Sequence, residues 1–191
     1  MPKSNRTITS PMRAALLECF QAATRLVRPD LRHQMILVGG AASIAHSSGA
    51  RSGGPFSLES DGKIAFDAPQ GFRIRIDLIE IGGGCIDVIH ATTPFLGGSL
   101  ASKSDLLRLR AKTVVERGSD GEVDDFRWLL RGVARERQVL PLLDDGEVED
   151  VVGAGGCLDI LDRLLLVAVL GAENGAAGFR LLLPPLPPPL S

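Results

Sequence analysis

The sequence is poor in aromatic residues and in cysteine. Its 191 residues include seven Phe, one Trp and no Tyr, so aliphatic side chains must fill most of the core. The three cysteines, Cys19, Cys85 and Cys157, are odd in number and far apart. This pattern excludes a disulfide framework and the paired spacing of a zinc site. We therefore expect reduced thiols in a cytoplasmic protein.

The chain also lacks a dominant charge and a long apolar run. Lys and Arg number 21 against 23 Asp and Glu, a net charge of −2, so no overall field favours a nucleic acid or a membrane as partner. A local basic patch remains open. The first twenty residues lack the apolar core of a signal peptide, and "LDILDRLLLVAVLGA" is charged and too short to span a bilayer.

With 45% apolar residues, the chain can bury a core. Ser10-Pro11 is typical of a helix start, and "MILV" (35–38) reads as a short buried strand. The turn pair Asp61-Gly62 predicts a hairpin, and "FRIRIDLIEI" (72–81) is the strongest strand pattern. Two amphipathic helices follow, in "SKSDLLRLRAKTVVER" and "EVDDFRWLLRGVARER". The predicted class is α/β (α+β), with a small mixed sheet flanked by helices.

Composition changes along the chain predict three regions. Residues 1–138 form the folded domain. Residues 139–175 form an acidic, Gly-rich and then apolar extension. Residues 176–191 form a proline-rich tail, which we expect to be disordered or polyproline II.

Gly39-Gly40 ends the apolar strand and is predicted to open a helix near residues 41–46. Backbone N–H groups are unpaired at a helix start, and glycine lets an anion approach them, so this turn is a candidate phosphate cradle. The alternative is an ordinary tight turn between strand and helix. Asp77 is the second candidate, because an acid in mid-strand is disfavoured unless it is paired or binds a ligand. The alternative for Asp77 is an ion pair with Arg75.

Four segments carry a resemblance to a known family: "ILVGGAASIAHSSGAR", "IRIDLIEI", "DLLRLRAKTVVER" and "VDDFRWLL". Together they resemble the nucleotidyltransferase fold of the DNA polymerase β superfamily, and most of all the minimal nucleotidyltransferase-like and AbiEii-type proteins, fungal members included. The resemblance covers about Pro11 to Arg135. It implies that Gly39 and Gly40 hold a nucleoside triphosphate. It also implies that Asp77 is the third of three carboxylates that hold two magnesium ions.

The sequence departs from this family after Arg51, which matches the arginine that often precedes the family's Asp-x-Asp pair. No Asp-x-Asp follows: the acids between Gly40 and Asp77 are Glu59, Asp61 and Asp67. Two-metal phosphoryl transfer needs several carboxylates around both ions, and one Asp with waters holds Mg²⁺ weakly. Asp87, in "CIDVIH", is the alternative source of a second acid. The metal-binding strand therefore looks deleted.

These observations lead to two functional hypotheses. The first is a degraded nucleotidyltransferase with weak or no transfer, weak Mg²⁺ binding and residual nucleotide binding. The second is a non-catalytic interaction or regulatory protein, whose partner contacts the proline-rich tail or the arginines of the late helices. A further alternative is that "ARSGGP" marks a truncated or mis-spliced product.

Overall fold

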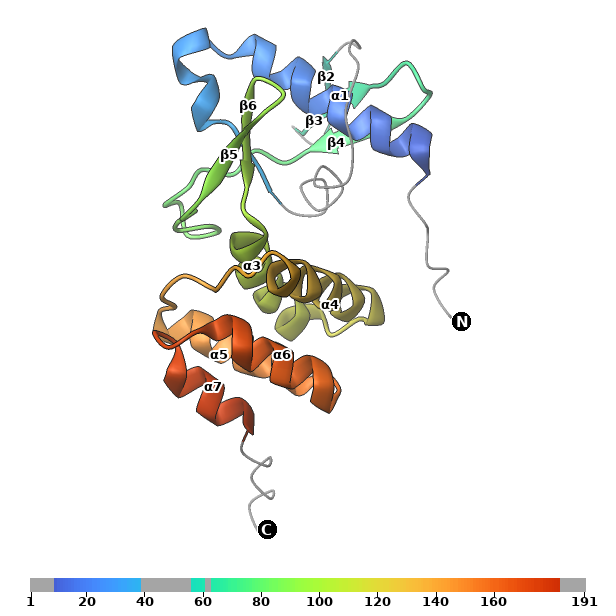
Figure 1. The fold of residues 1–191 in the computed structure, drawn as a ribbon. Helices are drawn as coiled ribbons and strands as arrows, with labels where there is room; N and C mark the ends of the chain where they lie inside the picture. Colours follow the sequence, from blue (N-terminus) through green and yellow to red (C-terminus); the bar gives the residue numbers. More distant parts are fainter. Residues whose placement is uncertain (1–8, 39–55, 61–62, 183–191) are drawn as a thin grey trace. The chain divides into compact units, whose positions relative to one another are not determined.

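A computed structural model describes residues 9–38, 56–60 and 63–182 of the chain (Figure 1). These residues belong to two compact units, Met1–Ser102 and Lys103–Ser191, which are described separately below. The first unit contains two small sheets and a long helix, and the described part of the second is helical. The mixed α/β class predicted from the sequence is confirmed.

The first unit begins with helix α1, Ser10–Leu26. Thr9 caps this helix, since its hydroxyl oxygen accepts a hydrogen bond from the Met12 N–H at 3.4 Å. The helix start is therefore one residue earlier than the predicted Ser10 cap, while Pro11 occupies the first turn as expected. A 3₁₀ helix, η1 (Pro29–Gln34), leads from α1 into strand β1, Ile36–Leu37.

Strand β1 lies at the edge of a mixed sheet with the order β1-β6-β5. It runs parallel to β6 (Gly98–Ala101), which pairs antiparallel with β5 (Thr92–Phe95). Gly98 is required in β6 because an added Cβ would lie 2.8 Å from the Phe20 ring and 2.9 Å from the Met35 carbonyl oxygen. This close packing fixes the sheet against α1.

The second sheet is antiparallel, with the order β2-β3-β4. Its strands are β2 (Phe56–Leu58), β3 (Ile64–Asp67) and β4 (Arg73–Ile76), so the predicted hairpin around Asp61-Gly62 is confirmed in its two strands. One face packs on α1 through a buried cluster of side chains, and Figure 1 shows the helix beside these strands. The cluster consists of Ala15, Cys19, Phe66, Ala68 and Ile74.

Three sequence-based expectations need correction in this unit. The described strands form two three-stranded sheets, where one mixed sheet was predicted. The strand predicted over 72–81 ends at Ile76, because its partner β3 begins at Ile64 and the ladder has no further pair. The strand predicted in "CIDVIH" is reduced to one isolated bridge between Ile81 and Ile86.

The second unit contains five helices within its described residues. They are α3 (Lys103–Arg117), α4 (Asp120–Arg135), α5 (Asp145–Gly156), α6 (Ile160–Leu170) and α7 (Gly175–Leu182). The apolar stripe predicted for α4 faces inward, since Phe126, Leu130 and Val133 are fully buried. The two predicted late helices are confirmed.

The C-terminal expectation is partly wrong. Residues 176–182, assigned from the sequence to a disordered tail, lie in α7, where Ala177 and Leu181 are buried. Leu181 packs so closely over Gly155 that a Cβ at position 155 would collide with it. Residues 183–191 lie outside the described part of the chain. None of the helices in the described part is both long and apolar enough to cross a membrane.

Candidate functional site

The candidate site is a cavity of about 420 Å³ in the first unit. Its wall comes from the end of η1, from β1 with the residue that follows it, and from the chain after β4. Most of the lining side chains are aliphatic, and Asp77 and Glu80 supply its two carboxylates. The lining residues are Gln34, Met35, Ile36, Val38, Asp77, Leu78, Ile79, Glu80, Ile81, Ile86 and Ile89.

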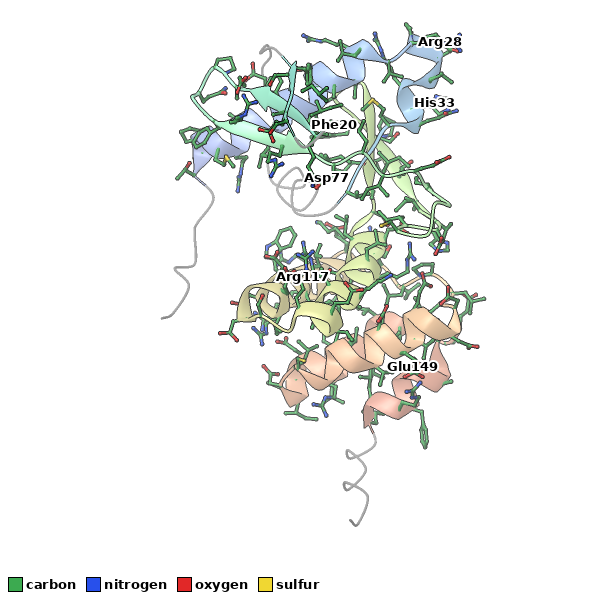
Figure 2. The ribbon with its side chains drawn as sticks, turned by 180° about the vertical axis from the view of Figure 1, so that it is seen from behind. Phe20, Arg28, His33, Asp77, Arg117 and Glu149 are labelled. Atoms are coloured by element: carbon green, nitrogen blue, oxygen red, sulfur yellow. The ribbon has the colours of Figure 1, made fainter. Side chains whose placement is uncertain are left out.

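Asp77 lies one residue beyond the end of β4 and is 67% exposed (Figure 2). Its Oδ1 accepts a hydrogen bond from Lys63 Nζ at 2.8 Å, in an ion pair that crosses from the start of β3. Arg75, the partner expected from the sequence, forms an ion pair with Glu59 at 2.7 Å. Asp77 is therefore a solvent-facing carboxylate with a lysine beside it.

Glu80 is a second acid of this cavity, and the sequence analysis did not single it out. Residues 77 and 80 would point to opposite faces of a regular strand, because their separation is odd. The chain leaves the ladder after Ile76, so this rule no longer applies and both residues line the cavity. Asp87, the alternative second acid, is exposed and is not among the lining residues.

The described residues do not fit a two-metal centre. Among them, no three His, Cys, Asp or Glu side chains come close enough together to hold a metal ion. The carboxylate of Asp77 already contacts an ammonium group, which competes with a divalent cation for the same oxygen. Magnesium needs near-octahedral oxygen coordination, and this donor set supplies only part of it.

The remaining predicted site residues, Gly39, Gly40 and Arg51, lie outside the described residues. The residue that precedes Gly39 is Val38, and Val38 lines the cavity together with Asp77. The described chain thus leads to the predicted phosphate turn from the wall of the Asp77 cavity.

The arginines of the late helices have mostly structural partners. Arg108 is buried and pairs with Asp105 and Glu147, and Arg110 pairs with Glu122. Both arginines therefore have carboxylate partners within the second unit.

The thiols differ in exposure. Cys19 lies on the buried face of α1, and burial raises the pKa of its thiol to about 12, whereas Cys85 and Cys157 are exposed. A thiol with such a high pKa is almost entirely protonated at neutral pH and is a poor nucleophile. Cys19 is thus a core residue.

Comparison of the chain with protein-family models, with curated proteins and with solved structures finds no match. The resemblance to nucleotidyltransferases therefore stays a prediction from the sequence motifs.

Proposed function

We propose that this chain is a nucleotidyltransferase-like protein that binds a nucleoside triphosphate at Gly39-Gly40 and transfers nucleotides weakly or not at all. The observation that carries the proposal is the shared cavity, since Asp77 and the residue before the glycine pair line the same wall. In the family that the sequence resembles, the phosphate turn and the third carboxylate belong to one site. A cavity of about 420 Å³ is also within the usual size of small-molecule sites.

The weakness of the reaction follows from the donor set. A two-metal reaction places one cation on the attacking oxygen and another on the leaving oxygen, and several carboxylates must neutralise both. Asp77 and Glu80 are the acids that line this cavity, and Asp77 is bound to Lys63. We expect Mg²⁺ to bind weakly and to leave the transition-state charge largely uncompensated.

The direct test incubates the full chain with labelled ATP, CTP or UTP and either Mg²⁺ or Mn²⁺, and measures nucleotide transfer and nucleotide-induced thermal shift. We expect a thermal shift and little transfer. The shift should fall with Gly40→Val, which blocks approach to the backbone, and any transfer should be lost with Asp77→Ala. Asp87→Ala is the matched control, because Asp87 is an exposed acid ten residues on that does not line the cavity. Robust transfer that survives Asp77→Ala would refute the proposal.

Lys63 offers a second test, which does not depend on turnover. Lys63→Met removes the ammonium group beside Asp77 and keeps most of the aliphatic length. Because an exposed pair contributes little free energy, we expect Mn²⁺ binding to become only about two- to fivefold tighter. Electron paramagnetic resonance of free Mn²⁺ measures the change. Tight binding of two Mn²⁺ ions by the unmodified chain would contradict the incomplete site.

The second candidate function is a non-catalytic interaction or regulatory role through the C-terminal region. One observation favours it: Phe179 and Leu182 of α7 are 64% and 52% exposed, immediately before the proline-rich residues 183–191. A pull-down that compares the full chain with a chain ending at Leu182 tests this role. Truncation before residue 176 would also remove the buried Leu181, so it would confuse loss of a partner with loss of packing. A tail-dependent partner without a nucleotide-induced thermal shift favours this function over the first.

A further inference from the structure

The second unit contains a groove of about 420 Å³ that the site above does not involve. It follows one face of α4, and Lys103 at the start of α3 closes its other side. Its lining residues are Lys103, Asp124, Arg127, Trp128, Arg131, Gly132 and Arg135, which we call the arginine groove.

The three arginines of the groove are four residues apart, so they follow one stripe of the helix. Two of them are held in place by Asp162, a carboxylate of α6 that is only 6% exposed. Arg127 Nε donates to Asp162 Oδ2 at 2.8 Å, and Arg131 donates to both carboxylate oxygens at 3.1 Å. One buried acid thus orients two guanidinium groups on the same stripe.

The charge of the groove is not fully balanced. Asp124 pairs with Arg127 at 2.7 Å, Glu136 pairs with Lys103, and Asp162 serves both Arg127 and Arg131. Within the described residues, Arg135 has no such partner. The four cations of the groove therefore have three carboxylate partners, and the excess positive charge is that of Arg135.

An aromatic surface lies beside these cations. Trp128 is the chain's only tryptophan, it lines the groove, and it is 46% exposed although large apolar side chains are normally buried. Gly132, also on this face of α4, lets the Lys103 side chain pack closely against the helix, since a Cβ there would lie 3.2 Å from Lys103 Cδ. The groove thus combines a planar apolar surface with guanidinium groups that a phosphate can bind in bidentate fashion.

We propose that the arginine groove binds a nucleotide, with its phosphate on Arg135 and Arg131 and its base stacked on Trp128. The planar guanidinium fork of arginine matches the geometry of a phosphate better than the compact ammonium group of lysine does. Every base has a π face that can stack on an indole. An acidic peptide would satisfy the arginines but would leave the indole without a partner. The nucleotide can be free or part of a single strand, because both offer the same phosphate and base.

The first experiment uses the emission of Trp128 in the full chain, where no other tryptophan contributes. The chain is titrated with a pyrimidine mononucleotide, its nucleoside, ribose 5-phosphate and inorganic phosphate. The mononucleotide should bind more tightly than any of the other three, because only it engages both halves of the groove. Equal affinity for ribose 5-phosphate would overturn the stacking on Trp128, and equal affinity for the nucleoside would overturn the role of the arginines.

Variants separate this groove from a general charge effect. Arg135→Gln removes the unpaired guanidinium and should weaken binding of the mononucleotide about tenfold, as loss of a charged hydrogen bond does. Arg137→Gln is the matched control, since it removes the same charge from an exposed residue outside the groove. Equal losses for the two variants, or none for Arg135→Gln, would overturn the proposal. Trp128→Ala, followed by calorimetry, should lose affinity while Trp128→Phe keeps part of it.

Two further measurements show whether the ligand is a free nucleotide or a strand, and whether the arginine groove binds it independently of the cavity at Asp77. A single-stranded oligonucleotide that binds more tightly than the mononucleotide, with affinity falling steeply in salt, indicates a strand, and equal affinity indicates a free nucleotide. A glutamate-rich peptide that binds as tightly as the nucleotide would overturn the proposal. Asp77→Ala and Gly40→Val should leave the Trp128 response unchanged, so failure of the proposed nucleotidyltransferase-like function would leave this inference standing.

Discussion

The two units of the chain bury their side chains to very different extents. Of the twelve largest side chains that are fully buried among the described residues, ten lie in Lys103–Ser191 and two, Leu17 and Phe66, lie in Met1–Ser102. The chain after β4 carries exposed apolar residues, among them Leu78 at 71%, and these line the cavity of the candidate site. The described part of the first unit thus concentrates its core in few residues and leaves apolar surface around its cavity.

The units also differ in whether their elements are stabilised by neighbouring residues or by residues far away in the sequence. In the second unit, called the helical unit below (Lys103–Ser191), Asp144 and Asp159 cap α5 and α6 within their own first turns. In the first unit (Met1–Ser102), β1 depends on β6, more than sixty residues away. Long-range pairing fails when a partner segment is lost, whereas a capped helix keeps most of its signals.

The largest expected effect comes from Phe66→Ala. Phe66 is fully buried, contacts Phe56 at 5.1 Å between ring centroids and belongs to the same cluster as Cys19. We expect the free energy of unfolding of the first unit to fall by about 4 kcal/mol. The rate at which Cys19 reacts with a thiol reagent, in a background with Cys85→Ser and Cys157→Ser, measures this opening.

Phe126→Ala is the matched change in the second unit, whose core contains ten large, fully buried side chains. Trp128 emission should report the loss of stability of the second unit, and Cys19 reactivity should change little. If either phenylalanine variant alters both probes together, the units unfold as one and the comparison above is wrong.

The second prediction concerns Asn174, which is 4% exposed and joins three segments of the helical unit. Its Oδ1 accepts from the Leu143 N–H at 3.0 Å, and its Nδ2 donates to the carbonyls of Pro141 and Leu170. Asn174→Ala leaves these buried groups unpaired, so we expect a loss of about 3 kcal/mol in denaturant unfolding followed by Trp128 emission. Glu173→Ala, at the exposed neighbouring position, should change little. An equally small effect of both variants would mean that water replaces the amide.

Helices α3 and α4 could be predicted because their apolar stripes are local. Helix α5 was missed, although "DDGEVED" contains the Asp-x-x-Glu spacing of a capping box at Asp144 and Glu147. The glycines of "VVGAGG" hid it, because glycine is a poor helix former. Gly155 is there for packing, since Leu181 occupies the space of a side chain.

The candidate site could be predicted only in part. Asp77 was found from its unusual position among apolar residues, and it lines the cavity. Its partner Lys63 was missed because it depends on the register between β3 and β4, and the second acid Glu80 was missed because it depends on where β4 ends. That end is set by the length of β3 opposite, and the alternation of "RIRIDLIEI" contains no signal for it.

The third prediction tests whether α5 is stabilised by the capping box at its own first turn. Asp144 accepts from the Glu147 N–H at 2.8 Å, while Glu147 Oε2 accepts from the Asp144 N–H at 3.1 Å. Asp144→Ala removes this capping box and should cost about 1 kcal/mol. Hydrogen exchange of the α5 amides gives the loss directly. Asp145→Ala removes an acid of the same first turn without the cap, so an equal loss there would indicate a general charge effect.

The smallest expected effect is the pH dependence at the start of α6. Asp159 accepts hydrogen bonds from the backbone N–H groups of Asp162 and Leu161, and these bonds hold the pKa of its carboxyl below the usual range. A lowered folded-state pKa means that the carboxylate stabilises α6 above its unfolded pKa of about 3.9, and that this contribution is lost as the pH falls through the lower folded value. Hydrogen exchange of α6 amides across this range should therefore quicken on acidification. Asp159→Asn keeps an acceptor for the same N–H groups but cannot titrate, so its α6 exchange should lose this step while the helix stays capped. If the step persists in Asp159→Asn, it arises from another carboxylate. The start of α6 then depends on residues outside its own cap.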